Sequence, residues 1–537
     1  MTDAETNTLT EQGGYGRRIA TSAVLIMLGN VASRLLGLVR EKTIAALFGT
    51  TAVASIFSAV SRVPTLVYDL LIGGAITAAL VPVFSEIAGR AERGGDPDAV
   101  DELRSVSGAV LVLALGALVP VVALLVLFAR PLIGVLGVGF AAEIQEQGIL
   151  LTRVALPSVL FLGVAAVLMA VLYALHRVLL PSFAAAVYNL GIIVCALALA
   201  RPLGVTGLVV GLLVGAAAQM GLQLVGLRDR LPRPSLRLRQ PAVRRITRLY
   251  APVAAGLVVS ALVVVLDTRL ASLTGEASLA AMRYATQVVQ LPLGLVATAL
   301  SFAVLPVLSR YGAGGAREAG FRDALAVGIK AAIFLITPLM VVLLVLREPL
   351  IALLFQRGAF GASDAVVTGR ALLYYAPQLP FVAVDQLLIA AFYALQNTRL
   401  PVVVGVVCAG IYTAVALLTL ERMGMAGLVL ANTVQNSAHA VILLALLVRR
   451  HASVVPRGLL LSTARMGGAA VCMAAVCYAF GRMVSAPTGT VALAGHVVAS
   501  MLLGGVAYLL ALLLLRGEEV QLARGAVVSR LRGRGAG

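Results

Sequence analysis

The chain has 537 residues, of which 60% are hydrophobic and only 12% are charged, and its mean hydropathy is +1.00. A soluble globular domain carries about 25% charged residues, so this composition excludes a soluble enzyme or binding module. The formal net charge of +18 does not indicate nucleic-acid binding, because the basic residues lie mainly between apolar segments, as the positive-inside rule places them.

Apolar segments of membrane-spanning length recur along the whole chain. Runs of roughly 18 to 25 apolar residues cross about 30 Å of hydrocarbon as α-helices, and the short alternating segments of a β-barrel are absent. We therefore predict an all-α integral membrane protein with about fourteen transmembrane helices. The predicted spans are 19–47, 54–86, 106–129, 148–174, 181–200, 204–227, 247–273, 279–308, 323–346, 366–395, 400–420, 424–448, 459–483 and 490–515.

Arginine-rich segments predict the orientation. Arginines precede the first span and gather in the connection 228–246 and in the tail 517–537. With fourteen spans these three segments lie on one side of the membrane, which the positive-inside rule identifies as the cytoplasm. We expect a multi-pass protein of the cytoplasmic (inner) membrane, with both termini in the cytoplasm and residues 1–16 forming a disordered tail.

An internal repeat organises the spans. Three pairs of similar segments lie 218, 220 and 224 positions apart: Pro131–Leu136 with Pro349–Leu354, Tyr173–Pro181 with Tyr393–Pro401, and Val81–Ser85 with Leu305–Ser309. The offset covers six spans, so both copies enter the membrane in the same direction, as in parallel-repeat transporters. We predict a first lobe at 17–227, a basic linker at 228–246, a second lobe at 247–449, two further helices at 450–516 and a tail at 517–537. The substrate path is expected between the lobes.

Charged side chains inside the predicted spans are candidates for function, because they are costly there. They concentrate in the first two helices of each lobe. Guanidinium groups pair bidentately with phosphate, so the arginines favour a phosphorylated, anionic substrate. The candidate substrate-binding residues are Arg34, Arg40, Glu41, Arg62, Asp69 and Arg269. As an alternative to substrate binding, Arg40 and Glu41 could extend to the lipid headgroups. Separately, Pro64, Pro292 and Pro380 should kink their spans.

Two carboxylates in the spans are candidates for ion coupling. Asp267 and Asp385 could bind Na⁺ or H⁺, or could serve as structural partners of cavity arginines.

No motif for catalysis is evident. The four histidines lack metal-ligand spacing, and Asp96-Pro-Asp98 is typical of a helix start rather than a metal site. We expect no enzyme activity, no metal, no resident cofactor and a monomeric protein.

Several short segments resemble a known family. The segment Ser33-Arg-Leu-Leu-Gly-Leu-Val-Arg40, together with Val81–Glu86, Leu305–Arg310, Leu354–Phe360 and Phe392–Leu395, is similar to the MurJ/MviN lipid II flippases. These proteins belong to the multidrug/oligosaccharidyl-lipid/polysaccharide exporter superfamily. The resemblance implies transport of an undecaprenyl-pyrophosphate-linked peptidoglycan precursor to the outer leaflet, with membrane lipids and cell-wall synthesis proteins as further candidate partners.

The resemblance also implies roles for particular residues. Arg34 and Arg40 match first-helix arginines that bind the pyrophosphate, Asp267 matches a Na⁺-site aspartate, and the last two helices match those that hold the lipid tail. The second helix departs from the family pattern at Pro64–Asp69, where an arginine of the family is missing. Three alternatives therefore stay open: a flippase for a teichoic-acid or exopolysaccharide precursor, a non-transporting scaffold for cell-wall synthesis, and a membrane glycosyltransferase.

Overall fold

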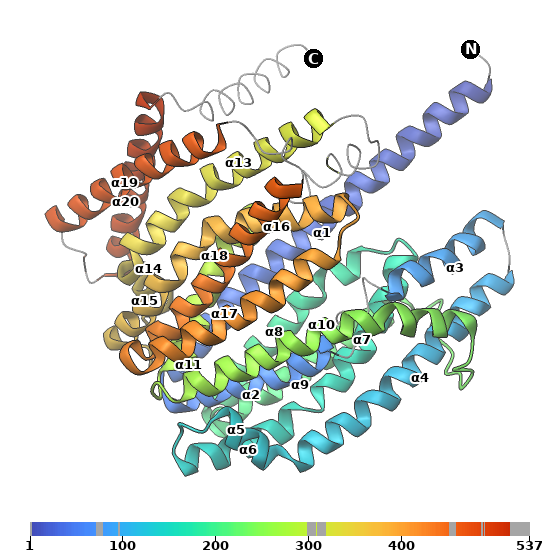
Figure 1. The fold of residues 1–537 in the computed structure, drawn as a ribbon. Helices are drawn as coiled ribbons and strands as arrows, with labels where there is room; N and C mark the ends of the chain where they lie inside the picture. Colours follow the sequence, from blue (N-terminus) through green and yellow to red (C-terminus); the bar gives the residue numbers. More distant parts are fainter. Residues whose placement is uncertain are drawn as a thin grey trace. The chain divides into compact units, whose positions relative to one another are not determined.

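The computed structural model describes residues 3–70, 79–94, 97–297, 308, 318–450, 458–484, 487 and 489–515. Helices make up nearly all of these residues, and no strand occurs among them (Figure 1). The chain divides into two compact units, Met1–Leu279 and Ala280–Gly537.

Within the described residues, ten helices are long and apolar enough to cross a membrane, or eleven if the bent pair Pro241–Ala251 and Gly256–Ser272 forms one span. These ten match ten of the predicted spans, and the bent pair matches an eleventh. The other three predicted spans carry several charges or adjoin residues 71–78 and 298–307, which lie outside the described residues. The prediction of an all-α membrane protein is confirmed.

The first unit surrounds a buried apolar core formed mainly by its third, fourth and seventh helices. In addition, α8 packs along both α1 and α9, and α7 packs against α4 and α9. The helices of this unit are α1 (Asp3–Phe48), α2 (Ala52–Tyr68), α3 (Val81–Gly94), α4 (Pro97–Leu127), α5 (Ala129–Leu136), α6 (Ala142–Ala155), α7 (Ser158–Ala174), α8 (Leu179–Leu203), α9 (Thr206–Gly226) and α10 (Pro241–Ser272).

The second unit repeats several of these packing relations. In it α17 packs along α18, α16 packs against α18, and the trailing helices α19 and α20 pack on each other and on α13. Its elements are α11 (Ser278–Pro292), η3 (Leu293–Ala297), α13 (Glu318–Val345), α14 (Arg347–Phe355), α15 (Ala362–Tyr375), η4 (Ala376–Gln378), α16 (Leu379–Ala394), α17 (Arg399–Met423), α18 (Met425–Arg450), α19 (Leu459–Met483) and α20 (Thr490–Leu514).

The predicted repeat is present in the backbone. His176 and Gln396, which lie 220 positions apart, adopt the left-handed conformation with φ of 54° and 57°. Among the described residues, they are the only two non-glycine residues with a positive φ. Each lies in the turn after a helix, α7 or α16, and precedes a helix of 25 residues, α8 or α17. Both of these helices then end at a glycine with φ of 57°, Gly204 or Gly424. Two copies of one helix–turn–helix unit therefore occur at a single offset.

Three details differ from the sequence-based expectations. Residues 3–16, predicted as a disordered tail, continue α1 as helix. The last residues of the predicted linker belong to α10, which begins at Pro241, because proline suits the first helical position. The short helices α5 and α14 lie in segments that were predicted as connections between spans.

The predicted proline kinks take different forms. Pro64 lies inside α2, Pro292 ends α11 before the π-helical turn η3, and Pro380 lies in the first turn of α16, after the 3₁₀ turn η4. Regular helix is therefore interrupted next to two of the three prolines.

Glycines allow α8 and α9 to approach closely, as small residues do between membrane helices. A Cβ atom added at Gly215 would lie 2.5 Å from the carbonyl oxygen of Tyr188, whereas a Cβ at Gly221, on the same helix, would meet no atom within 4 Å. We expect Gly215→Ala to destabilise the unit by about 1–3 kcal/mol through overpacking. Gly221→Ala should leave stability unchanged or raise it slightly, by up to about 1 kcal/mol.

Thermal unfolding in detergent, followed with a thiol-reactive dye, checks this pair of variants. The chain has no tryptophan, but Cys195, Cys408 and Cys477 are buried and become reactive on unfolding. Equal unfolding temperatures for Gly215→Ala and Gly221→Ala would contradict the close packing of α8 and α9.

Candidate substrate and ion sites

Arg40 of α1 is held by two acceptors in the first unit. Its Nε and Nη2 atoms donate to Oε1 of Glu41 at 3.0 and 2.6 Å, and its Nη1 atom donates to Oδ1 of Asn189 at 2.8 Å. Asn189, on α8, in turn donates to the carbonyl of Ser33 at 3.1 Å. These contacts use three of the five N–H groups of the guanidinium and fix its position between α1 and α8.

Glu41 is almost completely buried. Its side chain is 1% exposed and that of Arg40 is 20% exposed. Burial at this level argues against the alternative in which the pair extends to the lipid headgroups. Because a buried carboxylate requires a cation, one role of Arg40 is to neutralise Glu41, while one N–H each on Nη1 and Nη2 keeps the ability to bind an anion.

Arg62 of α2 pairs with α10. Its Nη1 atom donates to Oδ2 of Asp267 at 2.9 Å and to the hydroxyl of Thr268 at 2.7 Å. The Nε–H and both Nη2–H groups of Arg62 have no partner among the described residues, so this guanidinium also keeps anion-binding capacity. Asp267 is therefore an ion-pair partner of Arg62, and its role as an ion-coupling carboxylate stays a prediction.

The remaining predicted site residues lie in different settings. Arg34 is half-buried on α1, and Asp69 is exposed at the end of α2, next to Leu70, whose carbonyl accepts a hydrogen bond from the Tyr250 hydroxyl. Arg269 is exposed on α10, with no ion-pair partner among the described residues. The structure therefore brings Arg40 together with Glu41, and Arg62 together with Asp267.

Asp385 lies in the second unit and pairs with a histidine. Its Oδ1 atom is 2.7 Å from Nδ1 of His439, on α18. A search of the sequence for charged residues within spans misses His439 and Asn189, because both are neutral polar residues within apolar segments. The histidines were considered for metal binding, for which their spacing is unsuitable. A polar residue at a helix position otherwise surrounded by apolar ones is the signal that identifies both.

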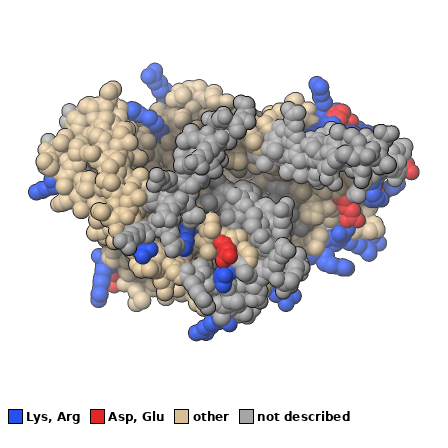
Figure 2. Space-filling view, turned by 90° about the horizontal axis from the view of Figure 1, so that it is seen from above, with Lys and Arg blue, Asp and Glu red and all other residues tan. Residues whose placement is uncertain are grey.

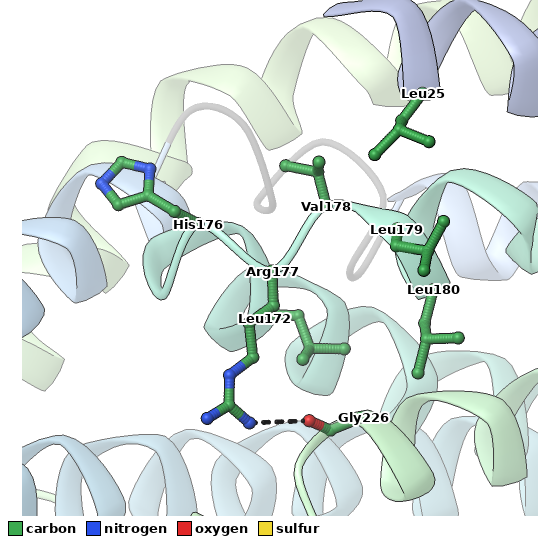
Figure 3. A pocket seen from close by; sticks show the side chains of 8 residues that line it. All are labelled: Leu25, Leu172, His176, Arg177, Val178, Leu179, Leu180 and Gly226. Carbon is green, nitrogen blue, oxygen red and sulfur yellow. Dashed lines mark hydrogen bonds between the residues drawn. The ribbon is translucent and has the colours of Figure 1, made fainter. Parts of the chain in front are cut away.

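A pocket of about 320 Å³ lies where α7 turns into α8 (Figure 3). It is lined mainly by aliphatic side chains, with His176 and Arg177 on the connecting turn. The Arg177 guanidinium donates to the carbonyl of Gly226 at 3.0 Å and bidentately to Asp229, at 2.5 Å for both bonds. Because Asp229 already neutralises its cation, this pocket is a poor candidate for an anionic substrate.

The Arg177–Asp229 pair predicts a pH dependence. The hydrogen bonds from Arg177 lower the pKa of Asp229 to about 2, below its ordinary value of 3.8. A carboxyl group with a lowered folded-state pKa stabilises the fold above its unfolded pKa and loses that contribution as the pH falls through the folded pKa. We expect Asp229→Asn to lower the unfolding temperature slightly at pH 6, and this difference from the wild type to shrink between pH 4 and pH 2. If the difference in unfolding temperature stayed constant from pH 6 to pH 2, the stabilising role of the Arg177–Asp229 ion pair would be contradicted.

The basic linker has both paired and unpaired arginines. Arg233 pairs with Asp101 at 3.3 Å, and Arg245 pairs with Glu86 at 2.6 Å. A second pocket, of about 350 Å³, is lined by Pro241 and four arginines, of which only Arg245 has an acidic partner among the described residues. Basic side chains are also more numerous than acidic ones on the face shown in Figure 2. An arginine surplus in a connection between spans, as in this linker, is typical of cytoplasmic connections of membrane proteins.

A repeated bundle of membrane-length helices with charged side chains held inside it defines the class of multi-pass helical membrane transporters. The fold is similar to that of a solved lipid II flippase MurJ in an inward closed conformation, with a TM-score of 0.77, 21% identity, and coverage of 91% of this chain and 98% of that one. It is also similar to an inward-facing multidrug resistance MATE transporter, with a TM-score of 0.64, 16% identity, and coverage of 80% and 98%.

Sequence comparison identifies the family. The model of the lipid II flippase MurJ family matches residues 44–512, so the chain belongs to this family. A probable lipid II flippase of Vibrio cholerae is 30% identical over 73% of this chain and 75% of its own length. One of Bdellovibrio bacteriovorus is 29% identical over 80% and 82%, and the lipid II flippase of Burkholderia cenocepacia is 28% identical over 72% and 75%. The chain is accordingly a multi-pass protein of the inner membrane.

Proposed function

We propose that this protein is a lipid II flippase, which moves the undecaprenyl-pyrophosphate-linked peptidoglycan precursor from the cytoplasmic to the outer leaflet by alternating access. The observation that carries the proposal is the family match over residues 44–512. The site geometry supports it, because Arg40 and Arg62 are both positioned by acceptors and both retain N–H groups for an anion.

The chemistry of the substrate explains the need for such arginines. A pyrophosphate headgroup with its saccharide does not cross about 30 Å of hydrocarbon unaided, so a polar path with fixed cations must replace its hydration. Guanidinium groups suit this role because they form parallel hydrogen bonds to phosphate oxygens and remain charged when partly buried. The polyprenyl tail stays in the lipid, and α19 and α20, which lie outside the repeat, are candidates to guide it.

The proposal includes an orientation. Both termini and the linker before α10 face the cytoplasm, a placement supported by the arginine surplus of the linker and by the pocket that Arg239 of the linker and three arginines at the start of α10 line. The protein acts as a transporter rather than an enzyme, and as a monomer. Lipid II and membrane lipids are its direct partners, and cell-wall synthesis proteins are candidates for further contacts.

A depletion experiment tests the function in cells. The chain is expressed in bacteria whose own lipid II flippase can be switched off, and lipid II exposed on the outer leaflet is quantified. We expect restored growth and outer-leaflet lipid II. Continued accumulation of lipid II on the cytoplasmic side, with the chain present in the membrane at normal levels, would contradict the proposal. Restored export of a different lipid-linked saccharide alone would show that the cargo is that saccharide.

A further inference from the structure

The Asp385–His439 pair of the second unit lies between membrane-length helices. Asp385 is on α16 and His439 is on α18, and the side chains are 16% and 15% exposed. The Nδ1 atom of the imidazole is 2.7 Å from Oδ1 of Asp385, and its Nε2 atom is 3.2 Å from the carbonyl oxygen of Pro401, at the start of α17. Both ring nitrogens therefore face oxygen acceptors, contributed by two different helices.

This geometry fixes the number of protons in the pair. A main-chain carbonyl can only accept a hydrogen bond, and a neutral imidazole has a single N–H. For both contacts to be hydrogen bonds, the pair must hold two protons, either as imidazolium with carboxylate or as neutral imidazole with carboxylic acid. Both forms have zero net charge. Loss of one proton would leave two acceptors facing each other and a net negative charge in a mostly buried site, which is unfavourable.

No other cation among the described residues neutralises the charge of Asp385. Among the described residues, no lysine or arginine forms an ion pair with Asp385. The helices and turns that pack on α16 and α18 are α13, α15, α17, η3 and η4, and among their described residues the thiol of Cys408, on α17, is the ionisable group that interacts electrostatically with Asp385. One turn before His439, Asn436 of α18 donates to Gln378 of η4 at 2.5 Å, so neutral polar contacts continue from the pair toward this turn.

The internal repeat allows the Asp385–His439 pair to be compared with the corresponding positions of the first copy. The positions 220 residues before Asp385 and His439 are Ala165, on α7, and Gln219, on α9, and α7 packs against α9 as α16 packs against α18. The first copy thus forms the same helix contact without a carboxylate–imidazole pair. Packing alone therefore does not require the pair in the second copy.

We propose that Asp385 and His439 bind one exchangeable proton, and that exchange of this proton couples the transport cycle to the transmembrane proton gradient. Of the two candidate ions for Asp385, the geometry points to H⁺, because the imidazole occupies the place at the carboxylate where Na⁺ would bind. The coupling role rests on the proposed flippase function, whereas proton binding itself does not.

Nuclear magnetic resonance of ¹⁵N-histidine-labelled protein tests proton binding. The chain has four histidines, so a His439→Gln variant identifies the signal of His439. Because the 2.7 Å contact is typical of a charge-assisted bond, we expect a doubly protonated ring at pH 7.5, where an ordinary histidine, with a pKa of about 6.5, is neutral. In Asp385→Asn the ring should be neutral at this pH. A neutral ring in the wild type, together with infrared bands of an ionised Asp385, would overturn the proposal.

Transport in proteoliposomes tests coupling. One proton per cycle predicts up to about a tenfold change in the equilibrium distribution of lipid II for each pH unit imposed across the membrane. We expect Asp385→Asn and His439→Gln to reduce this response to about onefold while lipid II still moves without a gradient. Cys408→Ser, a matched change beside the pair, should keep the full response.

The outcomes separate the two proposals. A full response to the pH gradient in both variants of the pair would overturn the coupling role. Absence of any lipid II movement in the wild type would contradict the flippase function instead, and the nuclear magnetic resonance result would still decide whether the pair binds a proton.

Discussion

Replacing Arg40 by alanine should abolish substrate movement and should also destabilise the protein. The variant removes a cation that has N–H groups available for an anion, and it breaks the ion pair of Glu41, whose side chain is 1% exposed. Breaking a buried ion pair by removing one member costs about 3–5 kcal/mol, so a decrease in thermal stability is expected as well. The measurements are the thermal unfolding midpoint in detergent and lipid II movement in proteoliposomes.

A double variant separates the two consequences. In Arg40→Ala/Glu41→Gln the buried negative charge is removed together with the cation, so stability should recover most of what the single variant lost. Transport should stay at the background level, because the cation for the pyrophosphate is still missing. If transport recovered together with stability, Arg40 would serve only to neutralise Glu41, and its assignment as a substrate ligand would be wrong.

Substitutions at Arg62 and Asp267 should have unequal effects. Arg62 is the group with free donors, and Asp267 orients it through a 2.9 Å ion pair. We expect Arg62→Ala to lower the transport rate about 100-fold and Asp267→Asn to lower it about tenfold, as loss of a charged hydrogen bond worth roughly 1.5–3 kcal/mol implies. Initial rates of lipid II movement check these values, with the exposed Glu276→Gln as a control that should be unaffected.

If the Asp267 substitution lowered the transport rate more than the Arg62 substitution, a different role would follow for Asp267. If Asp267→Asn were the more damaging variant and also removed a dependence on Na⁺, Asp267 would act as an ion-coupling carboxylate, as the family resemblance implies. An additive double variant, Arg62→Ala/Asp267→Asn, would also contradict the pairing, since residues in contact show interaction energies of about 0.5–3 kcal/mol.

The membrane-spanning helices were predictable because their physical requirement is simple. Each span needs a long apolar run, and ten such runs are described as helices at the predicted places. The repeat was also visible, since similar local segments such as those ending in His176 and Gln396 form the same turn. Short helices such as α5 escaped detection because a segment of eight residues is too short to span the membrane, so it was placed in a connection between two spans.

The site was predictable only in part. Charged residues inside spans identify candidates, but the pairing of Arg62 with Asp267 joins positions 205 residues apart, and sequence left open which arginine would be the partner. Asn189 and His439 escaped a search based on charge, because both are neutral in sequence and gain importance only from the acceptors and donors that other helices bring to them. Tertiary packing, rather than local pattern, decides these contacts.

Movement of fluorescent lipid II in proteoliposomes that contain the purified chain is the most direct measurement of the central claim. The fraction of lipid II accessible to a membrane-impermeant quencher is followed for the wild type and for Arg40→Ala/Glu41→Gln, with another prenyl-linked saccharide as a parallel substrate. The flippase account predicts movement of lipid II by the wild type and only background movement by the double variant. Equal, background-level movement of lipid II in both samples would contradict it.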